Sequence, residues 1–209
     1  MKKFYFILTG IIVIIAINVI IYTFIEAALS GNKYNFTTEY YKELELKFSG
    51  TKSDLVDEVQ NYIDSIAPYS NLRAFELVEN CEKYNIDIKF VLAQGEVESH
   101  FGTKGMASKT NSVWNVGAFD GYDLKHIRTK YNNPNQSIEP YLILLNKKYL
   151  INKIELDLLD KYESIDGYRY ATDKFYEEKL KNKYNYILNK TKIDSLQNKL
   201  KYYKDRLGK

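Results

Sequence analysis

The strongest restriction on the fold is an almost unbroken apolar run over residues 4–24. Two lysines precede this run, and the first charged residue after it is Glu26. About 20 consecutive apolar residues are enough for an α-helix to cross the hydrocarbon core of a membrane. Lysines before such a run place the N-terminus on the cytoplasmic side. We therefore predict one transmembrane helix within residues 1–28, which anchors the protein in the membrane with the rest of the chain outside the cytoplasm, in the periplasm or at the cell surface.

A cleaved signal peptide, cut near Ala27 and Ala28, is the alternative interpretation of this run. The apolar region of a signal peptide usually has about 7–15 residues, and the longer run here favours a retained anchor. Residues 29–52 are polar and are predicted to form a tether. Within the tether, Leu44, Leu46 and Phe48 alternate with charged residues, which predicts one extended stretch.

The composition limits the chemistry that the rest of the chain can perform. Its hydrophobic share of 45% and its 20 tyrosines allow a packed core, and a formal net charge of +3 does not indicate a nucleic-acid partner. A single cysteine, Cys81, excludes an internal disulfide and a cysteine-based zinc site. Two histidines, His100 and His126, are too few for a histidine-dominated metal centre. We expect no metal and no organic cofactor, and a nucleophilic Cys–His pair stays open without a supporting motif.

Beyond residue 52 the hydrophobic residues recur mainly at helical spacing, and residues that can cap helices mark the starts of successive segments. These capping residues are Ser53, Asn71, Asp87, Ser137, Asp173 and Thr191, and a further short helix is expected around residues 154–159. Residues 113–119 and 122–127 flank Asp120-Gly121, a strong signal for a hairpin turn. The predicted fold is therefore mainly α, with a small β-hairpin lobe.

The helix expected after Asp87 carries two carboxylates, Glu96 and Glu98. Two residues apart on a helix, they point to nearly opposite faces. Glu96 lies seven residues after Lys89, on a polar stripe, and is predicted to be a solvated surface acid. Glu98 lies seven residues after Val91 and projects from a face that is otherwise apolar or small.

Burial against apolar surface raises the pKa of a carboxyl group, and a raised pKa suits a general acid near neutral pH. Gly95, one turn before Glu98, removes side-chain bulk and lets a backbone or a ligand approach. The alternative is that Glu98 is a structural glutamate paired with a lysine. The helix alone leaves both interpretations open.

Three segments together resemble bacterial and phage glucosaminidases, which are glycoside hydrolases with a lysozyme-like fold. The first is LAQGEVESHFG (92–102), which is similar to the family's Leu-Ala-Gln-x-x-x-Glu-Ser-x-aromatic-Gly helix. The second is SKTNSVWNVGAFDG (108–121), and the third is GYRYATDKFYEEKL (167–180), which is similar to the family's Tyr-Ala-Thr-Asp-x-x-Tyr segment. The resemblance covers residues 62–187. It implies that Glu98 is the catalytic acid and Tyr170 the active-site tyrosine.

The chain departs from the family pattern at two places. Asn115-Val116-Gly117 replaces the end of the commoner Asn-Asn-Leu-Phe-Gly-Ile form. Where the family often has a second acidic residue, this chain has asparagines, and the nearest acids are Asp120, Asp123 and Glu139. Of these, Asp123 and Asp120 are the candidates for activating water. If neither serves, the acetamido group of the substrate can assist.

Further residues of the first two motifs are candidates for contact with a sugar. Aromatic faces stack on sugar rings, but the same aromatic residues can pack a hairpin onto helices. The candidates for substrate binding are Gln94, Ser99, Trp114, Asn115, Phe119 and Tyr122.

The resemblance implies a peptidoglycan hydrolase that cleaves the N-acetylglucosaminyl β-1,4 bond of glycan strands, acts as a monomer and needs no cofactor. The expected organisation is an anchor (1–28), a tether (29–52), a catalytic domain (53–189) and a basic C-terminal helix (190–209). A lytic transglycosylase and a catalytically silent wall-binding or assembly protein are the alternatives. A bacterial wall-remodelling enzyme and a phage endolysin both fit the sequence.

Overall fold

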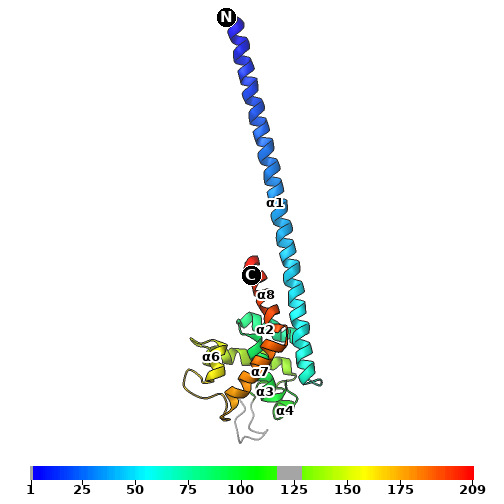
Figure 1. Ribbon diagram of the computed structural model, residues 1–209, viewed down its shortest axis with the longest axis vertical. Helices are drawn as coiled ribbons and strands as arrows, with labels where there is room; N and C mark the ends of the chain where they lie inside the picture. The colour runs from blue at the N-terminus through cyan, green and yellow to red at the C-terminus, as the bar shows by residue number, and fades with distance from the viewer. Residues whose placement is uncertain (1, 117–128) are drawn as a thin grey trace. The chain divides into compact units, whose positions relative to one another are not determined.

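The computed structural model describes residues 2–116 and 129–209, and for part of the first helix it describes the backbone alone. Its larger helices are α1 (Lys2–Ile66), α2 (Ala74–Tyr84), α3 (Ile88–Ser99), α7 (Tyr176–Lys190) and α8 (Ile193–Leu207) (Figure 1). The shorter ones are α4 (Ala107–Thr110), η1 (Pro134–Ser137), α5 (Ile138–Leu144), the π-helix η2 (Leu145–Tyr149) and α6 (Glu155–Asp160). The mainly helical part of the predicted fold is thus present and is consistent with a lysozyme-like domain.

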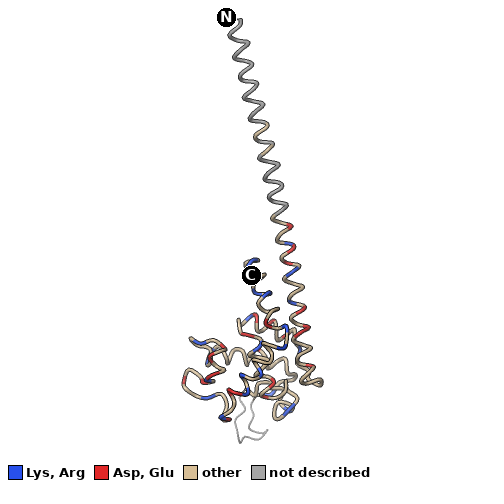
Figure 2. The backbone as a smooth tube through the Cα atoms, viewed as in Figure 1, with Lys and Arg blue, Asp and Glu red and all other residues tan. Residues whose placement is uncertain are grey.

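The predicted transmembrane anchor is wrong. Within the part of the chain that the structure describes, no helix combines the length and the apolar character needed to cross a membrane. The run over residues 4–24 opens α1, a continuous helix of 65 residues. Its later turns contain acidic and basic residues, coloured red and blue along the backbone in Figure 2, and Lys47 pairs with Glu43 at 2.5 Å. The membrane partner and the membrane-anchored location that were predicted from this run are therefore not supported.

The predicted extended stretch in the tether is also wrong, because these residues belong to α1. Leu44 and Phe48 are buried, whereas Leu46 between them is 74% exposed. Residues four apart lie on one face of a helix, and the residue between them points away. The alternation in the sequence was therefore the i, i+4 spacing of a helix, with Leu46 on its solvent side.

The predicted β-hairpin lobe is not found in the described residues, where an isolated antiparallel bridge between Glu163 and Arg169 is the single strand-like pairing. The described start of the expected first strand, residues 113–116, forms turns. Side chains bind its backbone instead of a partner strand: Val113 N–H donates to the Ser137 hydroxyl at 3.3 Å. The rest of the expected hairpin lies outside the described residues.

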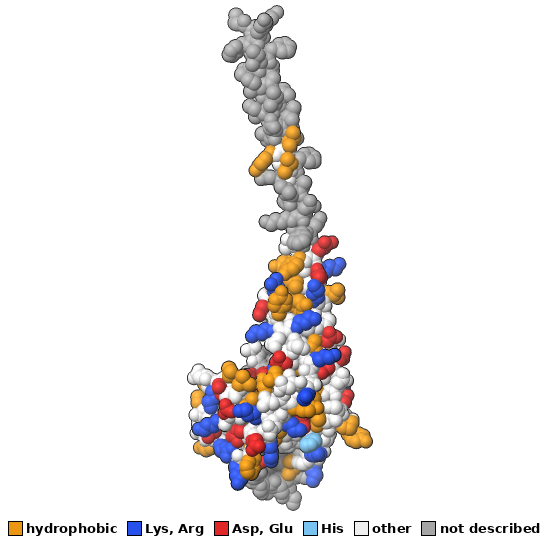
Figure 3. All heavy atoms as spheres, in the orientation of Figure 1, with side chains coloured by type: hydrophobic (Ala, Val, Ile, Leu, Met, Phe, Trp, Pro, Cys, Tyr) orange, Lys and Arg blue, Asp and Glu red, His pale blue; other side chains and the backbone are white. Residues whose placement is uncertain are grey.

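The chain divides into two compact units. The first comprises residues 1–49 and 203–209, in which Arg206 donates to the Tyr40 hydroxyl at 3.0 Å and Lys209 lies 2.7 Å from Glu45. The second comprises residues 50–202 and holds all three glucosaminidase-like motifs. On the face drawn in Figure 3, acidic and basic side chains of the described residues are intermixed.

Helix α3 lies in the core of the second unit, where ten of its 12 residues are buried and α7 packs against it. The predicted Asp87 cap is confirmed, since its carboxylate accepts the Lys89 N–H at 2.9 Å. The helix ends at His100, which takes a left-handed conformation with φ 47°. Ser137 also precedes α5 as predicted, although its side chain makes no capping hydrogen bond. The predicted starts at Ser53 and Asn71 are wrong, because α1 continues through Ser53 and α2 begins at Ala74.

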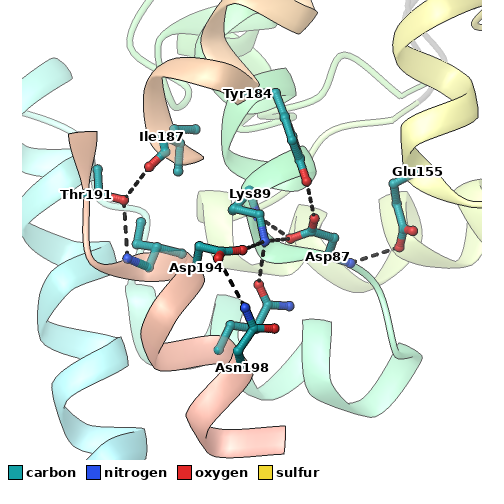
Figure 4. A network of polar contacts seen from close by, with 10 residues as sticks. Asp87, Lys89, Glu155, Tyr184, Ile187, Thr191, Asp194 and Asn198 are labelled. Atoms are coloured by element: carbon teal, nitrogen blue, oxygen red, sulfur yellow. Dashed lines mark hydrogen bonds and ion pairs between the residues drawn. The ribbon is translucent and has the colours of Figure 1, made fainter. Parts of the chain in front are cut away.

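A buried polar cluster joins the start of α3 to α7 and α8 (Figure 4). Lys89 is 6% exposed, and its ammonium lies 3.1 Å from Asp87 and 2.8 Å from Asp194 of α8. The Tyr184 hydroxyl of α7 donates to the other Asp87 oxygen at 2.9 Å. A buried cation needs such partners because burial without them is costly. This end of α3 is therefore held by ion pairs and a hydrogen bond to α7 and α8.

Candidate active site

The last turn of α3 presents Glu98, which is partly exposed in an otherwise buried helix. One of its carboxylate oxygens accepts a hydrogen bond from the Tyr176 hydroxyl, at the first residue of α7. The other accepts the Asn115 amide at 2.9 Å. Two neutral donors from distant parts of the chain thus fix the direction of this carboxylate.

Asn115 reaches Glu98 because its backbone is left-handed, with φ 52°, a conformation that asparagine tolerates better than most residues. Its amide nitrogen also lies 3.3 Å from the Glu98 carbonyl oxygen, so it holds both the side chain and the end of the helix. Its own side-chain oxygen is buried and has no hydrogen-bond partner among the described residues. Within the part of the site that the structure describes, this oxygen is an unmatched acceptor beside the carboxylate.

Ser99 and Gly102 anchor the turn that carries Asn115. The Ser99 hydroxyl donates to the Val113 carbonyl at 2.7 Å and accepts the Gly102 N–H at 2.8 Å. The two residues of the Glu-Ser pair therefore have different roles. The glutamate faces the candidate site, and the serine links the second motif to α3 by hydrogen bonds.

The Tyr170 hydroxyl donates to the Trp114 carbonyl at 2.6 Å. Its ring stacks on Tyr162, with centroids 4.5 Å apart, and on Tyr176, with centroids 5.8 Å apart. Burial and then the nearby negative charge of Glu98 raise the pKa of Tyr176 well above its usual value, and the same two causes raise the pKa of Tyr170. Both phenols therefore stay protonated and remain hydrogen-bond donors.

Gln94, one turn before Glu98, is fully buried among tyrosines. Its carbonyl oxygen accepts the hydroxyls of Tyr141 and Tyr162, the latter at 2.8 Å. Its amide nitrogen is buried and, within residues 2–116 and 129–209, has no hydrogen-bond partner. This is a second unmatched polar atom close to the candidate acid, and here it is a donor.

Gly95 is required by the packing of two aromatic rings. A Cβ atom at this position would lie 3.2 Å from the Phe101 ring and 3.3 Å from the Trp114 ring nitrogen. Trp114 is fully buried, stacks on Tyr141 with centroids 4.6 Å apart and donates to the Val91 carbonyl at 3.1 Å. The groups that approach Gly95 closely are thus the core side chains Phe101 and Trp114. The burial of Trp114 agrees with the alternative that this residue packs in the core instead of binding a sugar.

The prediction that Glu96 is a solvated surface acid is wrong. Glu96 is 2% exposed, accepts the Tyr62 hydroxyl at 2.5 Å and pairs with Lys183 of α7. The two acids do have different partners, as their register predicts. Their exposure is the reverse of the prediction, because other elements cover α3 on nearly all sides.

Sequence reasoning missed Tyr176, although it is the last residue of the third motif, Tyr-Ala-Thr-Asp-x-x-Tyr. Cys81 is buried, and burial raises the pKa of its thiol, which argues against a nucleophilic role. The described residues contain no group of three or more histidine, cysteine, aspartate or glutamate side chains that could hold a metal. Four predicted site residues lie outside the described residues: Phe119, Asp120, Tyr122 and Asp123.

The end of α3 thus presents a partly exposed carboxylate that accepts hydrogen bonds from a tyrosine hydroxyl and an amide. The family model described as "Glucosaminidase: Mannosyl-glycoprotein endo-beta-N-acetylglucosaminidase" matches residues 74–189, more than half of the chain. The chain belongs to this family, and the family domain supports a general activity as a glycan hydrolase. Comparisons with curated proteins and with solved structures gave no match.

Proposed function

We propose that the protein is a peptidoglycan hydrolase that cleaves the N-acetylglucosaminyl β-1,4 bond, with Glu98 as its general acid. Membership of the glucosaminidase family supports the reaction class. The observation that carries the assignment of the acid is the pair of contacts from Tyr176 and Asn115 to the two Glu98 oxygens. A carboxyl group held in this way can meet the leaving oxygen of a glycosidic bond in one defined orientation.

In the proposed mechanism, protonated Glu98 donates its proton to the glycosidic oxygen while the bond from that oxygen to the anomeric carbon breaks. Positive charge develops on the sugar, as in other glycosidases, and a water molecule supplies the new oxygen at the anomeric carbon. The carboxylate left behind keeps its hydrogen bonds from Tyr176 and Asn115, which stabilise its charge. Both donors therefore act more strongly after proton transfer than before it.

Tyr170 has a positioning role in this proposal. Its hydroxyl binds the Trp114 carbonyl, one residue before Asn115, and its ring stacks on Tyr176. It thus touches the elements that hold both donors to Glu98. Loss of its hydroxyl would loosen the turn that carries the amide.

The group that activates water is proposed to be Asp123 or Asp120, or else the acetamido group of the substrate. The anomeric configuration of the first product, followed by NMR, separates inversion by a water-activating aspartate from retention through substrate assistance. Loss of turnover in Asp123→Asn or in Asp120→Asn, but not in the other variant, would identify the aspartate.

Product analysis tests the reaction itself. Peptidoglycan is digested with the full chain, treated with borohydride and examined by mass spectrometry, with Glu98→Gln as the inactive control. The proposal expects reducible N-acetylglucosamine ends. An anhydro-sugar product would instead make the protein a lytic transglycosylase, and no product would favour a wall-binding role.

A further inference from the structure

A second site lies in the unit formed by residues 50–202, a pocket of about 900 Å³ between the end of α1, the start of α2 and the loop before η1. Its lining is rich in primary amides, which include Asn71, Asn111, Asn132, Asn133 and Gln136. Neither Glu98 nor the tyrosines around it line this pocket. The function proposed above therefore leaves it unexplained.

Several of these amides use one end to hold the backbone. The Gln136 carbonyl oxygen accepts the Asn132 N–H at 3.0 Å, and the Asn111 amide nitrogen donates to the Tyr131 carbonyl at 2.8 Å. The Asn133 oxygen accepts two N–H groups as the cap of η1. The opposite ends of these amides have no hydrogen bond to the described residues, which leaves donors and acceptors for a ligand.

Asn135 joins two walls of the pocket. Its side-chain oxygen accepts the Arg73 N–H at 2.7 Å, and its nitrogen donates to the Asn71 carbonyl at 3.2 Å. The loop before α2 and the loop at η1 are therefore held together without a ligand. A preformed site loses less entropy on binding than one that must be ordered.

The lining indicates what kind of ligand fits. Primary amides offer a donor and an acceptor side by side, which matches the peptide group. The Arg73 side chain is 74% exposed and lies 3.5 Å from Glu76, a loose contact that leaves its guanidinium able to bind a carboxylate. Sugar rings usually stack on aromatic faces, and the described residues that line the pocket include no aromatic side chain. Asp64 and Glu76 also line the pocket and can bind an amine. A short peptide that carries both an amine and a carboxylate therefore fits this chemistry better than a glycan does.

The pocket shares its walls with the segments around Glu98. The Ser70 hydroxyl donates to the Phe101 carbonyl, just beyond the end of α3, at 2.6 Å. Asn111 lies four residues before Asn115 on the same segment. Peptidoglycan carries a short peptide on its glycan, and five extended residues reach about 17 Å. For one strand to occupy both sites, the pocket and Glu98 must lie within that reach.

We propose that this amide-lined pocket binds the stem peptide of peptidoglycan and that Arg73 binds a carboxylate of that peptide, an inference that rests on the function proposed above. The site makes the enzyme select glycan that still carries its peptides. Glycan from which the peptides have been removed is then the poorer substrate.

Direct binding tests the site without any need for turnover. The pentapeptide L-Ala–γ-D-Glu–L-Lys–D-Ala–D-Ala is titrated into the full chain by isothermal calorimetry. Arg73→Ala should raise the Kd about tenfold, the loss of one charge-assisted hydrogen bond. Asn132→Ala, which keeps the backbone contact to Gln136, should raise it about threefold. Lys199→Ala, an exposed cation on α8, is the control and should leave the Kd unchanged.

Kinetics then link the pocket to selection of the substrate. The ratio of kcat/KM on intact glycan to kcat/KM on peptide-free glycan should fall about tenfold in Arg73→Ala and stay constant in Lys199→Ala. No binding of the pentapeptide by the wild type, or an unchanged ratio in Arg73→Ala, overturns the stem-peptide site. An equal loss on both substrates would assign the pocket to the glycan and also overturn it. If the wild type binds the pentapeptide but cleaves neither glycan, the proposed hydrolase function fails and the binding site stands.

Discussion

Glu96 and Glu98 lie two residues apart on α3, yet they differ in burial and in the groups that contact them. Glu96 is almost fully buried and is paired with the cation of Lys183. Glu98 is partly exposed and is contacted by the neutral donors Tyr176 and Asn115. A buried carboxylate beside a cation is stabilised as an ion, and removing one partner of such a pair is costly. An acid that must donate its proton to a substrate needs access to that substrate, so in this helix the more buried acid is the weaker candidate for catalysis.

The largest expected effect is that of Glu98→Gln on turnover. Glutamine keeps the size of the side chain and can still accept hydrogen bonds, but it cannot donate a proton to a leaving oxygen. We expect the rate of peptidoglycan hydrolysis to fall about 10³-fold or more, within the range for loss of a general acid. Release of reducing ends measures the rate, and circular dichroism checks that the fold is kept. Retained turnover would remove Glu98 from the mechanism.

Tyr176→Phe should have the next largest effect. The phenylalanine keeps the ring that stacks on Tyr170 but loses the hydroxyl that donates to Glu98. We expect kcat to fall about 10²-fold, the usual cost of one lost transition-state hydrogen bond. The melting temperature should change little because the ring still fills its place.

The variant Tyr62→Phe is the matched control for Tyr176→Phe. It removes the tyrosine hydroxyl that donates to Glu96 instead of the one that donates to Glu98. Thermal unfolding and initial rates are measured for both variants. If Tyr62→Phe lowers kcat as much as Tyr176→Phe does, the division of roles between the two acids is incorrect.

Tyr170→Phe should have a smaller effect of about tenfold on kcat. Its hydroxyl binds the Trp114 carbonyl and supports the turn at Asn115, so it acts on Glu98 through that amide. Asn115→Ala removes the amide itself and should lower kcat at least as much. In the double variant the two effects should be less than additive, since both changes weaken the same contact. Full additivity would mean that Tyr170 acts by another route, for example by direct contact with the sugar.

Sequence reasoning located α3 and Glu98 because their signals are local. The Asp87 cap, the helical spacing and the Glu-Ser pair all lie within 13 residues of one another. The same reasoning missed what covers the helix. The Tyr176 hydroxyl comes from 78 residues beyond Glu98, and Lys183 lies further along α7. Periodicity assigns a residue to a face of a helix, but the elements that cover that face decide its exposure.

The errors at the N-terminal end have a related cause. The apolar run over residues 4–24 was interpreted as a complete element, whereas the helix that contains it continues to Ile66. The alternation of Leu44, Leu46 and Phe48 fits both a strand and a helix over five residues, and only the helix accounts for an exposed Leu46 between two buried residues. A hydrophobic pattern of about five residues does not distinguish the period of a strand from that of a helix.

The smallest effect on turnover is expected for Glu96→Gln. The glutamine can still accept the Tyr62 hydroxyl, but the attraction to Lys183 is lost. Because Lys183 is about half exposed, solvent screens this pair, and we expect a loss of about 1–2 kcal/mol in the free energy of unfolding. For a chain of this size that corresponds to a fall of about 3–6 °C in Tm. Initial rates at 20 °C should stay within about threefold of the wild type. Lys183→Met removes the other partner and should lower the Tm without a large effect on kcat. A variant at Glu96 that keeps its Tm but loses its turnover would reverse the roles of the two acids.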